Sequence, residues 1–163
     1  YIDTAGHVIG MYPTAGVSAL ARGCVICQPA TFMRRDAVEA VGGLDRALHF
    51  GMDYDLWLRL AARYPVGQLT QVLAASRLHP GAKTVAQQLP FHREVVHMTA
   101  RRLGAAPFRW IYGYAAHLAR HWRHRLPAGA LWALPVTWAT AAALSLRFHW
   151  RPARWKPYAP SLP

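Results

Sequence analysis

Two carboxylates stand at the start of an apolar stretch, DYDLWLRLAARY, that spans residues 53–64. Apolar residues follow Asp53 and Asp55 at spacings of i, i+1, i+4 and i+5, which places them on one face of a helix. A carboxylate at the exposed end of a buried helix can take a proton from a reacting hydroxyl group. Asp53 is therefore a candidate general base. The alternative is a plain helix N-cap, worth about 1 kcal/mol.

Asp55 has a second interpretation, because Arg59 follows it four residues later. Oppositely charged residues at i and i+4 are neighbours on a helix surface, and such a pair contributes roughly 0.2–0.5 kcal/mol. The spacing therefore predicts an ion pair between these two side chains.

Three more short strings carry polar groups that could bind a substrate or a metal. They are QPATF at 28–32, RLH at 77–79 and GAKT at 81–84. Each also has an ordinary structural interpretation: a strand-end proline, a buried phenylalanine, a surface histidine and a polar loop need no function.

The order of these segments resembles the C-terminal half of the catalytic domain of family 2 glycosyltransferases. The resemblance implies an α/β protein: a partial GT-A (nucleotide-diphospho-sugar transferase) fold over residues 1–100, followed by a helical tail over 101–163. It also implies that the nucleotide-binding strands, with their metal-binding D-x-D pair, precede Tyr1. We therefore expect the chain to be a piece of a longer enzyme and inactive alone.

The resemblance gives the matching residues specific roles. Asp53 is implied to be the catalytic base, since DYD follows QPATF and opens a helix, whereas the metal-binding pair of the family follows an earlier strand. His79 is implied to complete the shell of a divalent metal, Mn²⁺ or Mg²⁺, whose main ligands lie outside this chain. Residues implied to bind substrate are Gln28, Phe32, Asp55, Arg77, Lys83 and Thr84.

The implied activity is a hexosyltransferase-type reaction in the synthesis of a cell-envelope polysaccharide. A single sugar would pass, with inversion, from a nucleoside diphosphate sugar to a saccharide or lipid-linked acceptor. The chain has no Q-x-x-R-W string of processive synthases, which favours transfer of single sugars, and Met52 stands where many members carry a second acid. The expected location is the cytoplasm or the cytoplasmic face of the inner membrane.

Hydrophobic patterns predict the elements that would position these residues. Strands are expected at the N-terminus, over 24–32 and within 66–79. The N-terminal strand is expected to turn at Thr4 to Gly6. One helix is expected from Asp36, where Glu39 completes a capping box, and glycines end it. Two more helices are expected, one from Asp53 to near Pro65 and one over about 91–103.

The tail differs from the rest of the chain in charge and composition. Residues 101–163 hold ten Lys/Arg and no acid, a net of +10, whereas residues 1–100 hold nine Lys/Arg and seven acids, a net of +2. Ala128 to Leu146 is a 19-residue stretch without charge, close to the roughly 20 residues of a membrane helix. An anionic membrane surface is thus a candidate partner, and the alternative is a helical pair packed on the catalytic domain.

Two function classes other than an enzyme remain open. A non-catalytic, membrane-anchored scaffold would explain the basic tail. A nucleic-acid-binding module would explain it too, but neither a recognition helix nor stacking aromatics on a sheet is recognisable, which argues against nucleic acid as a partner.

Two further groups of residues have types that could bind a metal or do redox chemistry, but in each case the surrounding sequence argues against that role. His117, His121 and His124 share one helical face, but no second segment with acid or cysteine ligands is evident. Cys24 and Cys27 lie in a predicted strand, where residues three apart point to opposite faces, so we expect small core residues rather than a redox pair.

Overall fold

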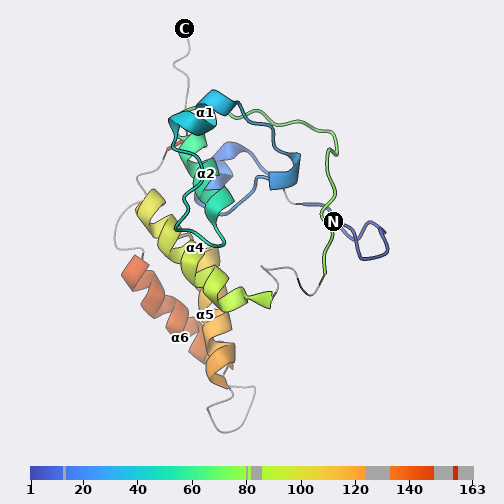
Figure 1. Ribbon diagram of the computed structural model, residues 1–163. Helices are drawn as coiled ribbons and strands as arrows, with labels where there is room; N and C mark the ends of the chain where they lie inside the picture. Colours follow the sequence, from blue (N-terminus) through green and yellow to red (C-terminus); the bar gives the residue numbers. More distant parts are fainter. Residues whose placement is uncertain (13, 80, 82–85, 124–132, 149–155, 158–163) are drawn as a thin grey trace. The chain divides into compact units, whose positions relative to one another are not determined.

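The structure is a computed structural model, and it describes residues 1–12, 14–79, 81, 86–123, 133–148 and 156–157 (Figure 1). The chain divides into two compact units, one formed by Tyr1–Ala86 with Lys156–Pro163 and the other by Gln87–Trp155. The boundary expected after residue 100 therefore falls inside a helix of the second unit.

In the first unit, the described residues form short helical elements. They are η1 (Val17–Ala21), η2 (Gln28–Ala30), α1 (Arg35–Ala40) and α2 (Met52–Ala61). The predicted helix at Asp53 is confirmed, and it ends before Pro65 as expected. The predicted capping box is wrong, because the N-cap of α1 is Arg34 and makes no side-chain cap bond. Gly42 and Gly43 do end α1, with φ of 85° and 66°.

The prediction of an α/β, partial GT-A fold is wrong for the part of the chain that the structure describes. Those residues form helices and only two isolated β-bridges, with no sheet. Ile2 pairs with Val8 in an antiparallel bridge and with Arg77 in a parallel one. The predicted strands over 24–32 and within 66–79 are absent.

Strand pairing stops at Ile2 because the neighbouring backbone groups find other partners. Asp3 N donates to His7 O within the antiparallel bridge. Beyond it, Asp3 Oδ1 accepts hydrogen bonds from Ala5 N and His7 N, at 2.9 Å each, and closes a tight loop. Gly6 has a φ of 95° in that loop. The predicted turn is therefore confirmed. A β-ladder needs paired residues at successive positions, whereas only single residues pair here.

The segment over 24–32 turns into η2 instead of extending. Pro29 has no N–H to donate to a neighbouring strand, and Thr31 Oγ1 donates to Cys27 O at 2.7 Å, which keeps that carbonyl within the turn. Cys24 and Cys27 form no disulfide and are half-buried rather than core residues. The two cysteines therefore do not lie on opposite faces of a strand.

The core of the first unit is built around α2. Seven of its ten residues are buried, on all sides of the helix. Tyr54 is among them, and its hydroxyl donates to Leu20 O at 2.5 Å, so that it ties α2 to η1. A helix that is buried nearly all round has few positions left where a polar group can face solvent. The start of α2 is one of them.

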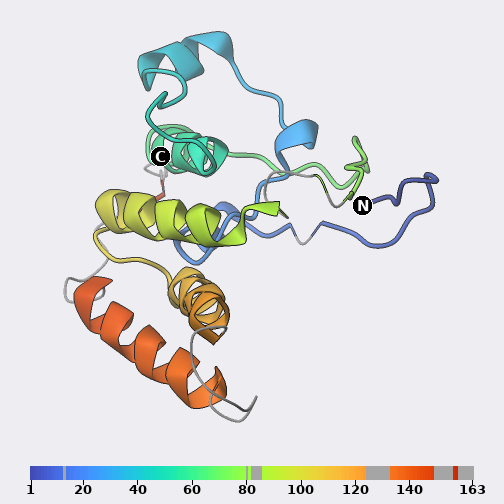
Figure 2. The ribbon, with the colours of Figure 1, turned by 60° about the horizontal axis from the view of Figure 1, so that its bottom comes forward.

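The described residues of the second unit form the helices α4 (Gln88–Leu103), α5 (Phe108–Arg123) and α6 (Ala133–Phe148) (Figure 2). The helix predicted over about 91–103 is confirmed as α4. It ends at Gly104, whose φ of 83° suits glycine, and the chain reverses into α5.

The three helices pack in order, α4 on α5 and α5 on α6. Ala106 N, just before α5, donates to Phe148 O at 3.2 Å, so the start of α5 meets the end of α6. The buried core cluster contains Val96, Ala106, Ile111, Ala115 and Ala141, and its alanines permit close approach of the helices.

One histidine of α4 packs directly against the backbone of α5. The His92 ring lies over Gly113, where a Cβ would come within 2.5 Å of its Cδ2 and Nε2 atoms. The ring centroid is 4.8 Å from that of His117, and His92 Nδ1 lies 2.8 Å from Gln88 O. Since a carbonyl only accepts, Nδ1 carries the proton, and the imidazole is held in one tautomer.

We predict that Gly113→Ala destabilises the protein by about 1 kcal/mol, because displacing His92 costs more than the gain in helix propensity of about 1 kcal/mol. In a His92→Ala background the same substitution should be stabilising instead. Urea unfolding of the four variants measures both effects. Gly67→Ala is the control, since nothing lies within 4 Å of its Cβ position. Equal effects of Gly113→Ala in both backgrounds would contradict the contact.

The stability of the protein should fall as the pH drops below 6.5. Burial lowers the pKa of His92 below its ordinary 6.5, and burial with the nearby His92 and Arg120 charges lowers the pKa of His117. The unfolded chain then binds more protons than the native chain below pH 6.5, so the stability is complete above that pH and decreases below it. Unfolding free energies at neutral and mildly acidic pH test this. The difference should shrink in His92→Gln, and an unchanged difference would assign it to other groups.

Candidate functional site

The start of α2 carries the residue that the sequence marks as the base. Asp53 lies in the first turn of α2, but the N-cap residue is Gly51, so the N-cap alternative for Asp53 is wrong. Asp53 Oδ1 accepts a hydrogen bond from the adjacent Tyr54 N at 2.7 Å. The side chain is half-buried, and burial raises its pKa above the usual 3.8, outweighing the backbone N–H bonds that lower it.

Asp55, two residues further, lies in a different environment. Its Oδ2 is 2.8 Å from both Arg59 Nε and Arg59 Nη2. The predicted ion pair is confirmed, but it is not a surface contact, because Asp55 is 1% and Arg59 16% exposed. The guanidinium also donates from Nη1 to Val41 O at 2.6 Å, at the end of α1. Asp55 therefore holds an arginine that links two helices.

The residues expected on the other side of the site lie in η2 and after it. Gln28 begins η2 and is exposed. Phe32 is 82% exposed, so its ring does not pack beneath a site in this structure.

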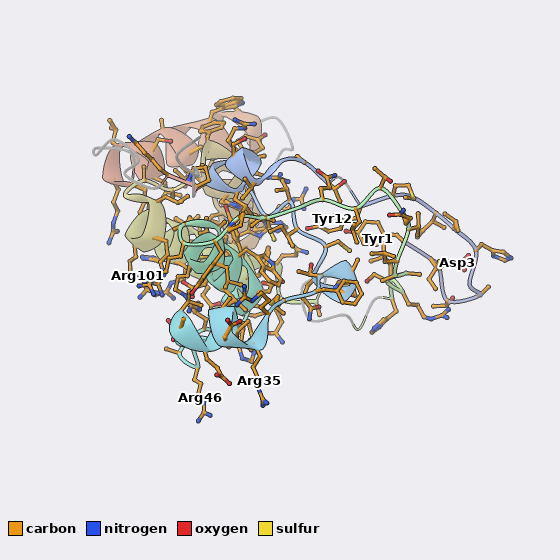
Figure 3. The ribbon with its side chains drawn as sticks, turned by 90° about the horizontal axis from the view of Figure 1, so that it is seen from above. Tyr1, Asp3, Tyr12, Arg35, Arg46 and Arg101 are labelled. Carbon is orange, nitrogen blue, oxygen red and sulfur yellow. The ribbon has the colours of Figure 1, made fainter. Side chains whose placement is uncertain are left out.

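Arg77 joins the N-terminal loop and the segment after residue 66. Its Nη1 donates to Asp3 O and Thr4 O, at 2.8 Å each, and Leu78 N donates to Ile2 O. Figure 3 shows Asp3 in the loop beyond Tyr1 and Tyr12, whose ring centroids are 5.9 Å apart. Arg77 is exposed as well as bonded, so it could meet an anion only by giving up carbonyl contacts.

His79 follows Arg77 and is exposed, with its ring beside Gly81. Lys83 and Thr84 lie outside the described residues. Among the residues that are described, no hydrogen bond or ion pair connects Asp53 with Gln28, Arg77 or His79. The described residues Asp53, Gln28, Arg77 and His79 thus belong to one unit, but no hydrogen bond or ion pair joins Asp53 to the other three.

The described part of the chain holds no group of three or more His, Cys, Asp or Glu side chains that could bind a metal ion. His79 alone supplies one ligand, too few for Mn²⁺ or Mg²⁺, which take mostly oxygen ligands. His124 of the predicted histidine triad lies outside the described residues. His117 does have a neighbour from a second segment, His92, which the sequence did not indicate because helix periodicity does not say which two faces meet.

Comparison of the chain with protein-family models, curated proteins and solved structures finds no match. A search of the described residues finds no helix that combines the length and the apolar character needed to cross a membrane.

The two carboxylates of α2 should differ in their effect on stability. Asp55→Asn leaves a mostly buried guanidinium without its counter-charge, and we expect a loss of about 3 kcal/mol. Asp53→Asn should change the stability by less than about 1 kcal/mol, because the amide oxygen can keep the bond to Tyr54 N. Urea unfolding of both variants measures this, and Asp36→Asn, which removes an exposed carboxylate paired with Arg34, is the control. Similar losses from Asp53→Asn and Asp55→Asn would overturn the assignment of separate roles.

Proposed function

We propose that this chain carries the catalytic base of an inverting glycosyltransferase. The enzyme would move a single sugar from a nucleoside diphosphate sugar to a saccharide or lipid-linked acceptor in the cytoplasm or at the cytoplasmic face of the inner membrane. The proposal is supported by the order of QPATF, DYDLWLRL and RLH in the sequence. One structural observation carries it further, namely the contrast between Asp53 and Asp55.

A general base must keep an oxygen available and must have a pKa near the working pH. Asp55 does not meet the first condition, since its carboxylate is buried against Arg59. Asp53 is half-buried at the start of the helix, and its pKa is raised by burial. Two neighbouring carboxylates in different environments commonly have different roles. In this proposal Asp55 stabilises the fold and Asp53 accepts the proton.

The reaction requires little of the base. The acceptor hydroxyl oxygen forms a bond to the anomeric carbon as the bond from that carbon to the diphosphate breaks, and the diphosphate leaves with the electron pair. Asp53 takes the hydroxyl proton during this step. Attack opposite to the leaving group inverts the anomeric centre. The raised pKa makes the Asp53 carboxylate a stronger proton acceptor than an ordinary aspartate.

The diphosphate needs compensating positive charge, and Arg77 is the candidate among the described residues. A divalent metal would have to take its main carboxylate ligands from outside this sequence, with His79 as one further ligand. Since the described residues do not form a metal site, none of the steps above is assigned to a metal. The sugar nucleotide is likewise proposed to be bound mainly by residues outside this sequence, so the 163-residue chain alone should be inactive.

The test is Asp53→Asn in the natural protein that carries this sequence. We expect kcat to fall by about 10²–10⁴ with little change in the melting temperature, because the shape remains and the proton acceptor is lost. The pH profile of wild-type kcat should also show an acidic limb with a pKa above 3.8.

Asp55→Asn is the matched control in the same helix. Its main effect should be on stability, and activity should return when the assay temperature is lowered. Near-normal turnover of Asp53→Asn, or a loss in Asp55→Asn that persists in folded protein, would contradict Asp53 as the base.

A further inference from the structure

Helix α6 presents an apolar stripe to the exterior. Its members are exposed, are spaced at i, i+3, i+4, i+7 and i+11, and include no polar residue. We call this set the outer stripe: Pro135, Trp138, Ala139, Ala142 and Leu146. Trp138 is 56% and Leu146 71% exposed.

The opposite face of α6 is already used for packing. Ala141 belongs to the core cluster with Ile111 and Ala115 of α5, and Leu144 and Phe148 pack against the same cluster. At about 100° per residue, these positions lie roughly opposite the outer stripe. Helix α6 therefore has its own core contact on one face, and the outer stripe is a second apolar face.

A helix that is apolar on both faces is normally covered on both. Over Ala133–Leu146 there is no charged residue, whereas an ordinary surface helix carries charged residues on its outer face. Large exposed apolar patches mark sites that bind a protein or a membrane. The outer stripe therefore requires a partner with an apolar surface.

Aromatic side chains from α5 extend the stripe. Trp138 contacts Phe108 and Tyr112, with ring centroids 6.2 Å and 5.5 Å apart, and Phe108 and Tyr112 are 6.1 Å apart. Phe108 is exposed and Tyr112 half-buried. Tryptophan and tyrosine rings favour the boundary between hydrocarbon and water, because they combine an apolar body with a polar tip.

The charge of the second unit decides between possible partners. Residues 87–155 hold ten arginines and one acid, Glu94, a net of +9. A second copy would bring two strongly cationic units face to face, and their repulsion opposes that contact. Nucleic acid would satisfy the charge, but an all-apolar stripe offers it no hydrogen-bond donors. An anionic lipid surface matches both the apolar stripe and the positive charge.

We propose that the outer stripe docks on an anionic lipid bilayer, with α6 lying along the interface and Trp138 and Leu146 entering the acyl boundary. Arg147, next to the stripe, contributes attraction to anionic headgroups. Interfacial binding also fits the finding that no described helix is long and apolar enough to span a bilayer. This inference is independent of the proposed transferase activity.

Vesicle flotation of the full 163-residue chain tests the inference. Wild-type protein should float with vesicles of phosphatidylglycerol and phosphatidylcholine, and much less with phosphatidylcholine alone. The double variant Trp138→Ser with Leu146→Ser should lower partitioning by about tenfold or more, because two apolar side chains are lost from the interface. Arg147→Gln should lower it about fivefold on anionic vesicles only.

The matched control is Leu69→Ser with Val72→Ser, which removes two exposed apolar side chains from the first unit. It should bind like wild type. Circular dichroism should show the same helix content in both double variants, since all four side chains are exposed. A small loss of melting temperature is expected only in the stripe variant, because the Trp138 ring contacts Phe108 and Tyr112.

Three results would overturn the inference. One is failure of the wild-type chain to bind anionic vesicles at low salt. Another is equal binding by the stripe variant and the control. The third is a wild-type dimer that the stripe variant converts to monomer, which would identify a second copy as the occupant.

Discussion

The buried contact between Asp55 and Arg59 is the interaction on which the first unit depends. Arg59 donates to Val41 O, and Arg63 of the following turn donates to Ala40 O at 2.9 Å. Two arginines after the middle of α2 thus satisfy the last carbonyls of α1, groups that a helix end leaves without intrahelical partners. Placing a guanidinium there is costly unless its charge is balanced, and Asp55 supplies that balance. The contact orients α2 and thereby determines where its first turn lies.

This constraint also leaves Asp53 available for its proposed role as a base. The helix is held by its buried faces, by the Tyr54 hydroxyl and by the Arg59 contacts, so Asp53 is not required for its anchoring. A group that is positioned by its neighbours but not needed by them can titrate without loss of the fold. The sequence shows the same difference between Asp53 and Asp55, since only Asp55 has an arginine four residues later.

The described helices of the second unit pack through small and apolar residues. Alanines allow α4, α5 and α6 to approach closely, and Gly113 admits the His92 ring where any Cβ would interfere. The same preference for small apolar residues continues onto the outer side of α6. Packing within the unit therefore uses one apolar face of α6 and leaves the other for a partner.

The sequence by itself determined the helices and the local contacts. Periodicity predicted α2 and α4, the glycines marked the end of α1, and the four-residue spacing predicted the Asp55–Arg59 pair, because each depends on residues within one or two helical turns. Tertiary structure alone decided the rest. Strand-like runs such as 24–32 become strands only when partners accept their hydrogen bonds, and the described residues supply none beyond single bridges. Likewise, whether Asp55 lies on a surface or in a core, and whether His117 meets His92, depends on which faces are buried together.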